Sequence, residues 1–169
     1  MSWRGENQCC DRAPDAKEIP LTEAGPDYAK NAIPEVARCF WQTFAMPQTQ
    51  AWLMALQLAK HRFRGQRGGA IGLEILATVQ AMRHSRVSCF RFNNPACNSC
   101  AAFVSEHERQ FMSVFRAVPN KPEGPARSHA MLLCEGNDTE LLIERMTELV
   151  RVTYPKICAL PVPSPEYLH

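Results

Sequence analysis

The stretch "AIGLEILATVQAMRH", residues 70–84, decides the fold class. Its apolar side chains recur every three or four residues, which is the period of one helix face. They are Ile71, Ile75, Val79 and Met82, with Leu73 and Leu76 on other faces. A helix that is apolar on more than one face is buried among its neighbours. The stretch therefore predicts the central helix of an all-α protein.

Further helices are predicted on both sides of this stretch. They cover residues 33–46, 49–63, 105–118 and, as a hairpin that turns at Gly136, residues 125–152. Pro47 ends the first of them, and Ser105 with Glu108 forms a capping box before the third. The expected inner face of 49–63 is Trp52, Leu56, Ala59 and Phe63. Only residues 87–92 could form a short strand, so we expect an irregular bundle of five or six helices.

The two ends of the chain differ in composition from its helical middle. Residues 1–30 are polar and punctuated by prolines and glycines, which predicts a flexible arm. Residues 155–169 hold four prolines and predict a Pro-rich tail, because proline cannot continue a helix. The expected organisation is one helical domain over 31–154, with a cysteine-rich loop at 88–100.

The bulk composition is that of an ordinary globular protein. Of the 169 residues, 46% are hydrophobic, and the formal net charge is +2. No apolar run approaches the roughly 18 residues that a membrane helix needs, and the first residues lack the apolar centre of a signal peptide. We therefore expect a cytoplasmic protein without a membrane partner, in which the eight cysteines are mostly reduced.

Three of the cysteines fall within "CFRFNNPACNSC", residues 89–100. Cys97 and Cys100 form a C-x2-C, the spacing at which two thiolates can turn toward one ion. Cys89 lies across an Asn-Asn-Pro sequence that favours a turn. The same loop can therefore supply a third ligand.

A closed tetrahedral site needs a fourth donor from elsewhere in the chain. Cys134, in the last turn of a predicted helix, is our choice, and His84, His107 and His129 compete with it. Thiolates suit zinc or an iron–sulfur cluster rather than magnesium or calcium, and the spacing does not separate the two. The predicted metal ligands are Cys89, Cys97, Cys100 and Cys134.

Two other interpretations of these thiols stay open. Cysteine is among the most buried residue types, so they could be inert core groups, as we expect for Cys39 and Cys158. A C-x2-C is also typical of redox dithiols, although those lie in a βαβ unit, whereas the flanking sequence here is helical. Cys9 and Cys10 are adjacent and cannot easily bind one ion together, so we interpret them as a stray pair.

The stretch "CFRFNNPACNSC" resembles the cysteine signature of ferric-siderophore reductases, which bind a two-iron cluster. Those proteins carry adjacent cysteines, a short run with aromatic residues and arginine, and then a C-x2-C. This chain has Ser88-Cys89 in place of the adjacent cysteines, a shorter gap, and the motif in mid-chain. The resemblance favours an iron–sulfur cluster over zinc as the group that the cysteine loop binds.

The segment from Lys60 to Arg91 is basic: it contains seven lysine and arginine residues and one acidic residue, Glu74. Arginines clustered beside glycines can contact phosphates. Cations at a helix end are also stabilised by the helix dipole without any ligand. The arginines that would contact nucleic acid or another anion are Arg62, Arg64, Arg67, Arg86 and Arg91.

The sequence contains no dinucleotide-binding, P-loop or nucleophile-elbow motif. The H-E-x-x sequence that starts at His107 lacks the second histidine of a zinc protease. An enzyme is therefore the less favoured class. We expect a metal-binding accessory or regulatory protein that acts through a protein partner. The alternatives are an iron–sulfur oxidoreductase or electron carrier, and a nucleic-acid-binding regulator that uses residues 60–91.

Overall fold

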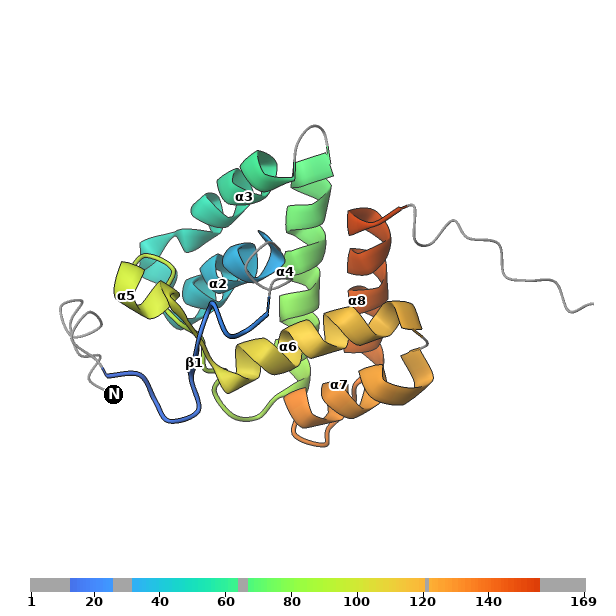
Figure 1. The fold of residues 1–169 in the computed structure, drawn as a ribbon. Coiled ribbons are helices and arrows are strands. Elements are labelled where there is room, and N and C mark those ends of the chain that lie inside the picture. The colour runs from blue at the N-terminus through green and yellow to red at the C-terminus, as the bar shows by residue number, and fades with distance from the viewer. Residues whose placement is uncertain (1–12, 26–31, 64–66, 121, 156–169) are drawn as a thin grey trace, which may run out of the picture.

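The computed structural model describes residues 13–25, 32–63, 67–120 and 122–155. Their elements follow in the order β1 (Ile19–Pro20), α2 (Ala32–Ala45), η2 (Pro47–Thr49), α3 (Ala51–Arg62), α4 (Arg67–Ser85), α5 (Asn98–Ala101), β2 (Phe103–Val104), α6 (Glu106–Ala117), η3 (Val118–Asn120), η4 (Pro122–Ala126), α7 (Arg127–Leu133) and α8 (Glu140–Thr153). These residues are mostly helical (Figure 1), which confirms the all-α character.

Helix α4 lies at the centre of the described structure and contacts α2, α3 and α8. Ile71, Ile75, Val79 and Met82 are buried, as their helical spacing predicts. Leu73, in contrast, is exposed. The buried face of α4 therefore joins the N-terminal and C-terminal halves of the bundle through one apolar core.

Helix α3 packs against α2 and α4 through its small side chains. Ala51, Ala55 and Ala59 are buried, whereas Trp52 is 46% exposed. A Cβ atom on Gly68 would lie 2.6 Å from the Cα of Lys60, so α3 and α4 meet almost backbone to backbone. The expectation that Trp52 belongs to the inner face was wrong, whereas Ala59 is buried and Leu56 and Phe63 pack partly buried against the core.

The C-terminal half consists of α6, α7 and α8, which pack against one another. The predicted capping box opens α6: the Glu108 N–H donates to Ser105 Oγ at 3.1 Å, and the Ser105 N–H donates to Glu108 Oε2 at 2.7 Å. The predicted hairpin turns after α7, where the Gly136 N–H donates to the Met131 carbonyl at 2.8 Å. Glu135 already has a left-handed φ of 60°, so the left-handed turn begins one residue earlier than predicted.

A two-residue antiparallel pair joins the N-terminal part of the described chain to the middle of the sequence. Ile19 of β1 lies opposite Val104 of β2, and Leu21 and Ala24 pack against the core. The prediction of a flexible arm over 1–30 therefore needs correction for residues 13–25, because their apolar side chains are anchored. The rest of that arm, with Cys9 and Cys10, and residues 156–169 of the predicted tail, with Cys158, lie outside the described residues.

Residues 87–92, where a short strand was considered, contain no strand. Among the helices of the described residues, none is both long and apolar enough to cross a lipid bilayer.

Candidate functional site: a cleft lined by cysteines

A cleft of about 1260 Å³ opens beside the loop that joins α4 to α5. Its walls come from that loop, from the ends of α2 and α3, and from the anchored N-terminal residues. Cys89, Cys97 and Cys100 all line it. Cys89 is exposed, whereas Cys97 and Cys100 are 6% and 7% exposed. Three of the four predicted metal ligands therefore share one cleft.

The local sequence explains how Cys97 and Cys100 are placed. The Asn94 side chain accepts a hydrogen bond from the Ala96 N–H at 2.9 Å, which forms the turn that the Asn-Asn-Pro sequence predicts. Cys97 then precedes α5, and its carbonyl accepts from the Ala101 N–H at 2.8 Å. The turn therefore brings Cys97 and Cys100 to the same cleft.

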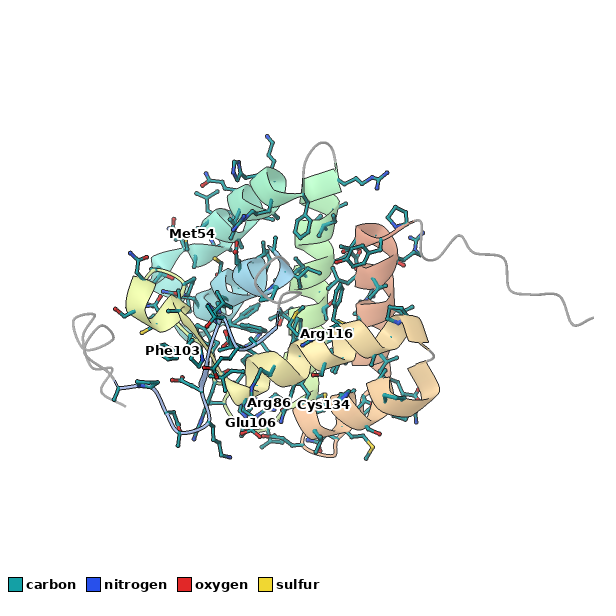
Figure 2. The ribbon with its side chains drawn as sticks, viewed as in Figure 1. Met54, Arg86, Phe103, Glu106, Arg116 and Cys134 are labelled. Atoms are coloured by element: carbon teal, nitrogen blue, oxygen red, sulfur yellow. The ribbon has the colours of Figure 1, made fainter. Side chains whose placement is uncertain are left out.

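Cys134, the predicted fourth ligand, lies elsewhere. It is buried where α7 ends, beside Arg86 (Figure 2), and it is not among the residues that line the cleft. Burial raises the pKa of the Cys134 thiol, and a hydrogen bond with Ser85 partly opposes this effect. Within the described ranges, no three Cys, His, Asp or Glu side chains are grouped closely enough to hold a metal ion. The predicted quartet is therefore not assembled.

His107 is the one competing histidine in the described lining of the cleft. Its Nδ1 accepts a hydrogen bond from the Arg91 N–H at 2.9 Å, and its ring lies 5.4 Å from that of Phe90. Burial, assisted by the charge of Arg86, lowers the pKa of His107. The neutral ring then carries its proton on Nε2, so neither nitrogen offers a lone pair to a metal in this arrangement.

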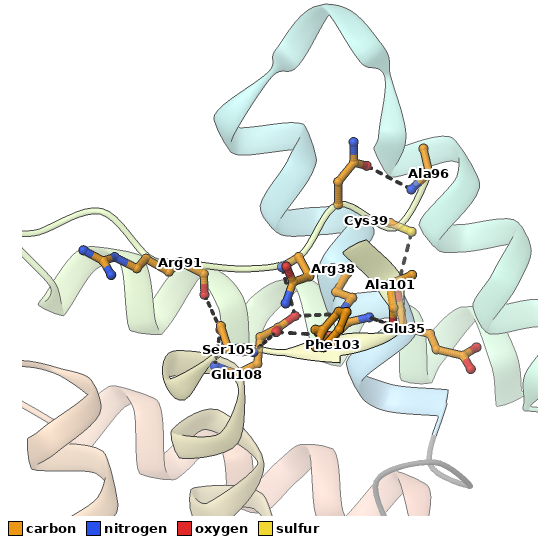
Figure 3. Close-up of polar contacts among 11 residues, drawn as sticks. Glu35, Arg38, Cys39, Arg91, Ala96, Ala101, Phe103, Ser105 and Glu108 are labelled. Carbon is orange, nitrogen blue, oxygen red and sulfur yellow. Dashed lines mark hydrogen bonds and ion pairs between the residues drawn. The ribbon is translucent and has the colours of Figure 1, made fainter. Parts of the chain in front are cut away.

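A buried ion pair, Arg38 with Glu108, holds the C-terminal side of the cysteine loop (Figure 3). Arg38 Nε lies 2.6 Å from Glu108 Oε1. The same guanidinium donates to the carbonyls of Ala101 at 3.0 Å and Phe103 at 2.6 Å. Glu108 also accepts from the Asn93 N–H at 3.4 Å. Residues 93–103, which carry both thiols of the C-x2-C, are thus fixed at both ends.

A second ion pair, here called the surface pair because Glu135 is partly exposed although Arg86 is buried, holds the N-terminal side of the same loop. Glu135 Oε2 accepts from the N–H groups of Val87 at 2.9 Å and Ser88 at 3.0 Å. Its Oε1 lies 2.9 Å from Arg86 Nη2 and accepts from the Ser88 hydroxyl. The hydrogen bonds from Ser88, followed by that from Val87, lower the pKa of Glu135 to about 2.

Aromatic rings anchor the loop between these two ion pairs. The ring of Trp41, on α2, lies 4.4 Å from Phe90 and 6.2 Å from Phe92. Cys89 and Arg91, which alternate with these phenylalanines, are exposed. The alternation of exposed and aromatic residues in 87–92 therefore belongs to an extended loop that packs its phenylalanines inward, and not to a strand. Cys89 stands on a segment that is held both before and after it.

The basic residues of segment 60–91 are mostly engaged within the protein. Arg62 pairs with Glu35 at 2.7 Å, and Arg91 pairs with Asp15 at 3.3 Å. The Arg86 side chain is only 4% exposed, so it cannot reach a phosphate. Arg67 is exposed at the start of α4, whereas Arg64 lies outside the described residues. Of the five arginines predicted to contact an anion, Arg86 is therefore buried, and Arg62 and Arg91 are engaged in ion pairs.

Gln42 is a cleft residue that sequence reasoning missed. It stands in α2 after an apolar run and is 5% exposed. Its Oε1 has no hydrogen-bond partner among the described residues. A polar residue on the inner face of an apolar helix was the available signal, because buried polar atoms normally find partners.

Comparison with known proteins assigns no family. The chain matches no protein-family model, no curated protein and no solved structure. The resemblance to ferric-siderophore reductases therefore rests on residues 89–100 alone. Any functional assignment must come from the chemistry of the cleft.

Proposed function

We propose that this chain is an accessory or regulatory protein whose Cys97 and Cys100 exchange a disulfide with a partner protein. One observation carries the proposal: both thiols of the C-x2-C line the same cleft, with Cys97 directly before α5 and Cys100 within it. A disulfide needs only such a pair, whereas zinc and iron–sulfur clusters usually take four ligands. Dithiol chemistry therefore needs no donor beyond Cys97 and Cys100, which share the cleft.

In the proposed reaction, one thiolate attacks a disulfide of the partner, which forms a mixed disulfide and releases one partner thiolate. The second thiolate then attacks the mixed disulfide, closes the Cys97–Cys100 bond and releases the other partner thiolate. The dithiol loses two electrons and the partner disulfide gains them. The two protons pass through solvent to the released thiolates.

The surroundings support a selective reaction of this pair. Burial raises the pKa of Cys39 to about 11 and also raises that of Cys134, which keeps both as unreactive thiols. The ends of the segment 93–103 are fixed by Arg38 and Glu108. The segment that carries Cys97 and Cys100 is therefore fixed at both ends, while the less exposed thiols of Cys39 and Cys134 stay protonated.

The test is a redox titration of the full chain against mixtures of reduced and oxidised glutathione, followed by intact mass and peptide mapping. We expect reversible loss of two hydrogen atoms and a Cys97–Cys100 peptide. Cys97→Ser and Cys100→Ser should each abolish it, and the matched control Cys134→Ser should retain it. A pair that stays reduced at an oxidising ratio at which other small dithiols are oxidised would overturn the proposal.

Metal binding is the second proposal, since Cys89 shares the cleft with Cys97 and Cys100. It requires Cys89 to move toward the pair, and it leaves the fourth position to a water or an exogenous group. Such an open position is typical of reactive or sensing sites rather than structural ones. Metal analysis and visible absorption of anaerobically purified protein separate the cases, because a zinc protein is colourless and a cluster protein is brown. Metal that persists in the Cys97→Ser/Cys100→Ser variant excludes this site.

A further inference from the structure

The outer surface of α3 and α4 carries features that the proposed disulfide exchange does not use. The two helices contact each other side by side (Figure 1). A Cβ atom on Gly72 would lie 3.4 Å from Leu56 Cδ2, and one on Gly68 would lie 2.6 Å from the Cα of Lys60. Leu73 directly follows Gly72, so it adjoins Leu56. The outer residues of the two helices therefore belong to one surface.

Large apolar side chains lie on this outer surface. Leu53, Leu56 and Lys60 are spaced by three and four residues, which places them on one face of α3. Leu53 is 46% exposed, and Leu56 is partly buried. On α4, Leu73 is 59% exposed. These four residues are here called the α3–α4 face, and the exposed Trp52 adjoins it beside Leu53.

The charge of this surface is positive. No aspartate or glutamate occurs between Glu35 and Glu74, so α3 and the first two turns of α4 contain no acidic residue. Arg62 pairs with Glu35 at 2.7 Å. Lys60 and Arg67 are exposed, and within the described ranges neither forms an ion pair. Both lie at the same end of the face, because Arg67 precedes the glycine that packs on Lys60.

The mixture of apolar and positive residues decides the class of partner. Protein–DNA interfaces are polar and strongly positive, whereas here three exposed apolar residues, Trp52, Leu53 and Leu73, accompany two cations. Tryptophan is enriched at interfaces between proteins. A protein segment that presents apolar and acidic side chains together complements both features. An amphipathic helix does so, and it can pack on two neighbouring helices as a third helix would.

We propose that the α3–α4 face docks an acidic amphipathic helix of a partner protein. The apolar stripe of that helix packs on Leu53, Leu56 and Leu73, and the carboxylates beside the stripe pair with Lys60 and Arg67. The inference does not rest on disulfide exchange, because none of these five residues is among those that line the cysteine cleft.

The direct test is fluorescence anisotropy with the full chain and fluorescein-labelled peptides of about 18 residues, or five helical turns. One peptide carries leucines at every third or fourth position, with glutamates beside them. The second has lysines in place of the glutamates, and the third has the residues of the first in an order that breaks the stripe. The first should bind at least tenfold more tightly than either control. Equal affinity of the first peptide and either control, or no binding of the first, would overturn the inference.

Charge reversal tests the ionic contact. Lys60→Glu/Arg67→Glu should weaken the acidic peptide at least tenfold and should make the lysine peptide the tighter ligand, because like charges repel across an interface. The control Arg116→Glu/Arg127→Glu changes the net charge equally at exposed arginines of α6 and α7, and it should retain the wild-type preference. A reversed variant that still prefers the acidic peptide would refute the assigned ion pairs.

Truncation of the exposed leucines tests the apolar contact. Leu53→Ala and Leu73→Ala should each weaken the acidic peptide at least about threefold, since each removes apolar area from the interface. The control Leu132→Ala, at a leucine that is 64% exposed on α7, should not. Unchanged melting temperatures would show that the variants are folded. Wild-type affinity in both Leu53→Ala and Leu73→Ala, or tighter binding of a short DNA duplex than of the acidic peptide, would overturn the proposed docking.

Discussion

Two ion pairs hold the two ends of the cysteine loop with the same chemistry but in different surroundings. In each, a carboxylate accepts backbone N–H groups of the loop and pairs with an arginine that also donates to a backbone carbonyl. The Glu108 side chain of the buried pair is 0% exposed, and that of Glu135 in the surface pair is 29% exposed. The arginines of both pairs are buried, so water and salt act on the second pair only through Glu135 and screen it in part, whereas they do not reach the first pair. The two sets of contacts should therefore contribute very different amounts to the free energy of unfolding.

The backbone under each carboxylate differs as well. Glu108 stands in the first turn of α6, where the helix dipole stabilises a negative charge and the capping box uses the same carboxylate. Glu135 has a left-handed φ of 60°, which an L-residue other than glycine seldom adopts. In the buried pair, the helix start and the ion pair both stabilise the Glu108 carboxylate. In the surface pair, the ion pair instead offsets the backbone strain at Glu135. This difference can be tested by substitution.

The largest effect is expected from Glu108→Ala. The change leaves the Arg38 guanidinium buried without its carboxylate, which typically costs about 3–5 kcal/mol. Urea unfolding followed by circular dichroism measures the loss. The double variant Arg38→Met/Glu108→Leu should recover only part of it, since the carbonyls of Ala101 and Phe103 lose their donor too. A single variant that costs no more than a surface substitution would show that the two pairs are equivalent.

A smaller effect, dependent on pH, is expected from Glu135. Its pKa in the folded chain is about 2, below its ordinary value of 4.5, so its stabilising contribution is complete above 4.5 and is lost as the pH falls toward 2. The melting temperature of the wild type should fall more steeply over this interval than that of Glu135→Gln. Glu148→Gln is the control, because Arg151 holds the pKa of Glu148 low at a site far in sequence from the loop. Parallel curves for the wild type and Glu135→Gln would refute the assigned role.

The smallest effect is a ranking between two substitutions of the same residue. Glu135→Gln and Glu135→Gly both remove the carboxylate, but glycine adopts a positive φ without steric cost. The glycine variant should therefore melt at a higher temperature than the glutamine variant. The reverse order would mean that the glutamine amide still holds Val87 and Ser88, and hydrogen exchange at those two N–H groups would show whether it does.

Much of the fold was predictable because its signals are local. The spacing of Ile71, Ile75 and Val79 marked the buried face of α4, and Ser105 with Glu108 marked the start of α6. The inner face of α3 was predicted in part, because Ala59 is buried and Leu56 and Phe63 pack against the core, but Trp52 is exposed. Periodicity identifies an apolar stripe but does not reveal that α3 and α4 approach closely at Gly68, where Ala59 lies between them.

The candidate site was predictable in part for the same reason. The C-x2-C and its preceding turn are local, and the structure places Cys97 and Cys100 together in one cleft. The partnership of Arg38 with Glu108 spans 70 residues, and no short-range pattern reports it. The predicted link between the loop and the turn after α7 does exist, but Glu135 makes it rather than Cys134. A difference of one residue at a helix end changes which side chain faces the loop.

The long sequence separation of the buried ion pair has a consequence for synthesis on the ribosome. Cys97 is added to the chain eleven residues before Glu108. At about 5–20 residues per second, the translating ribosome needs about one second to supply that carboxylate. Until then, the chain that carries the thiols of the C-x2-C contains no Glu108 to pair with Arg38. The dithiol is therefore always synthesised before the scaffold that holds its loop is complete.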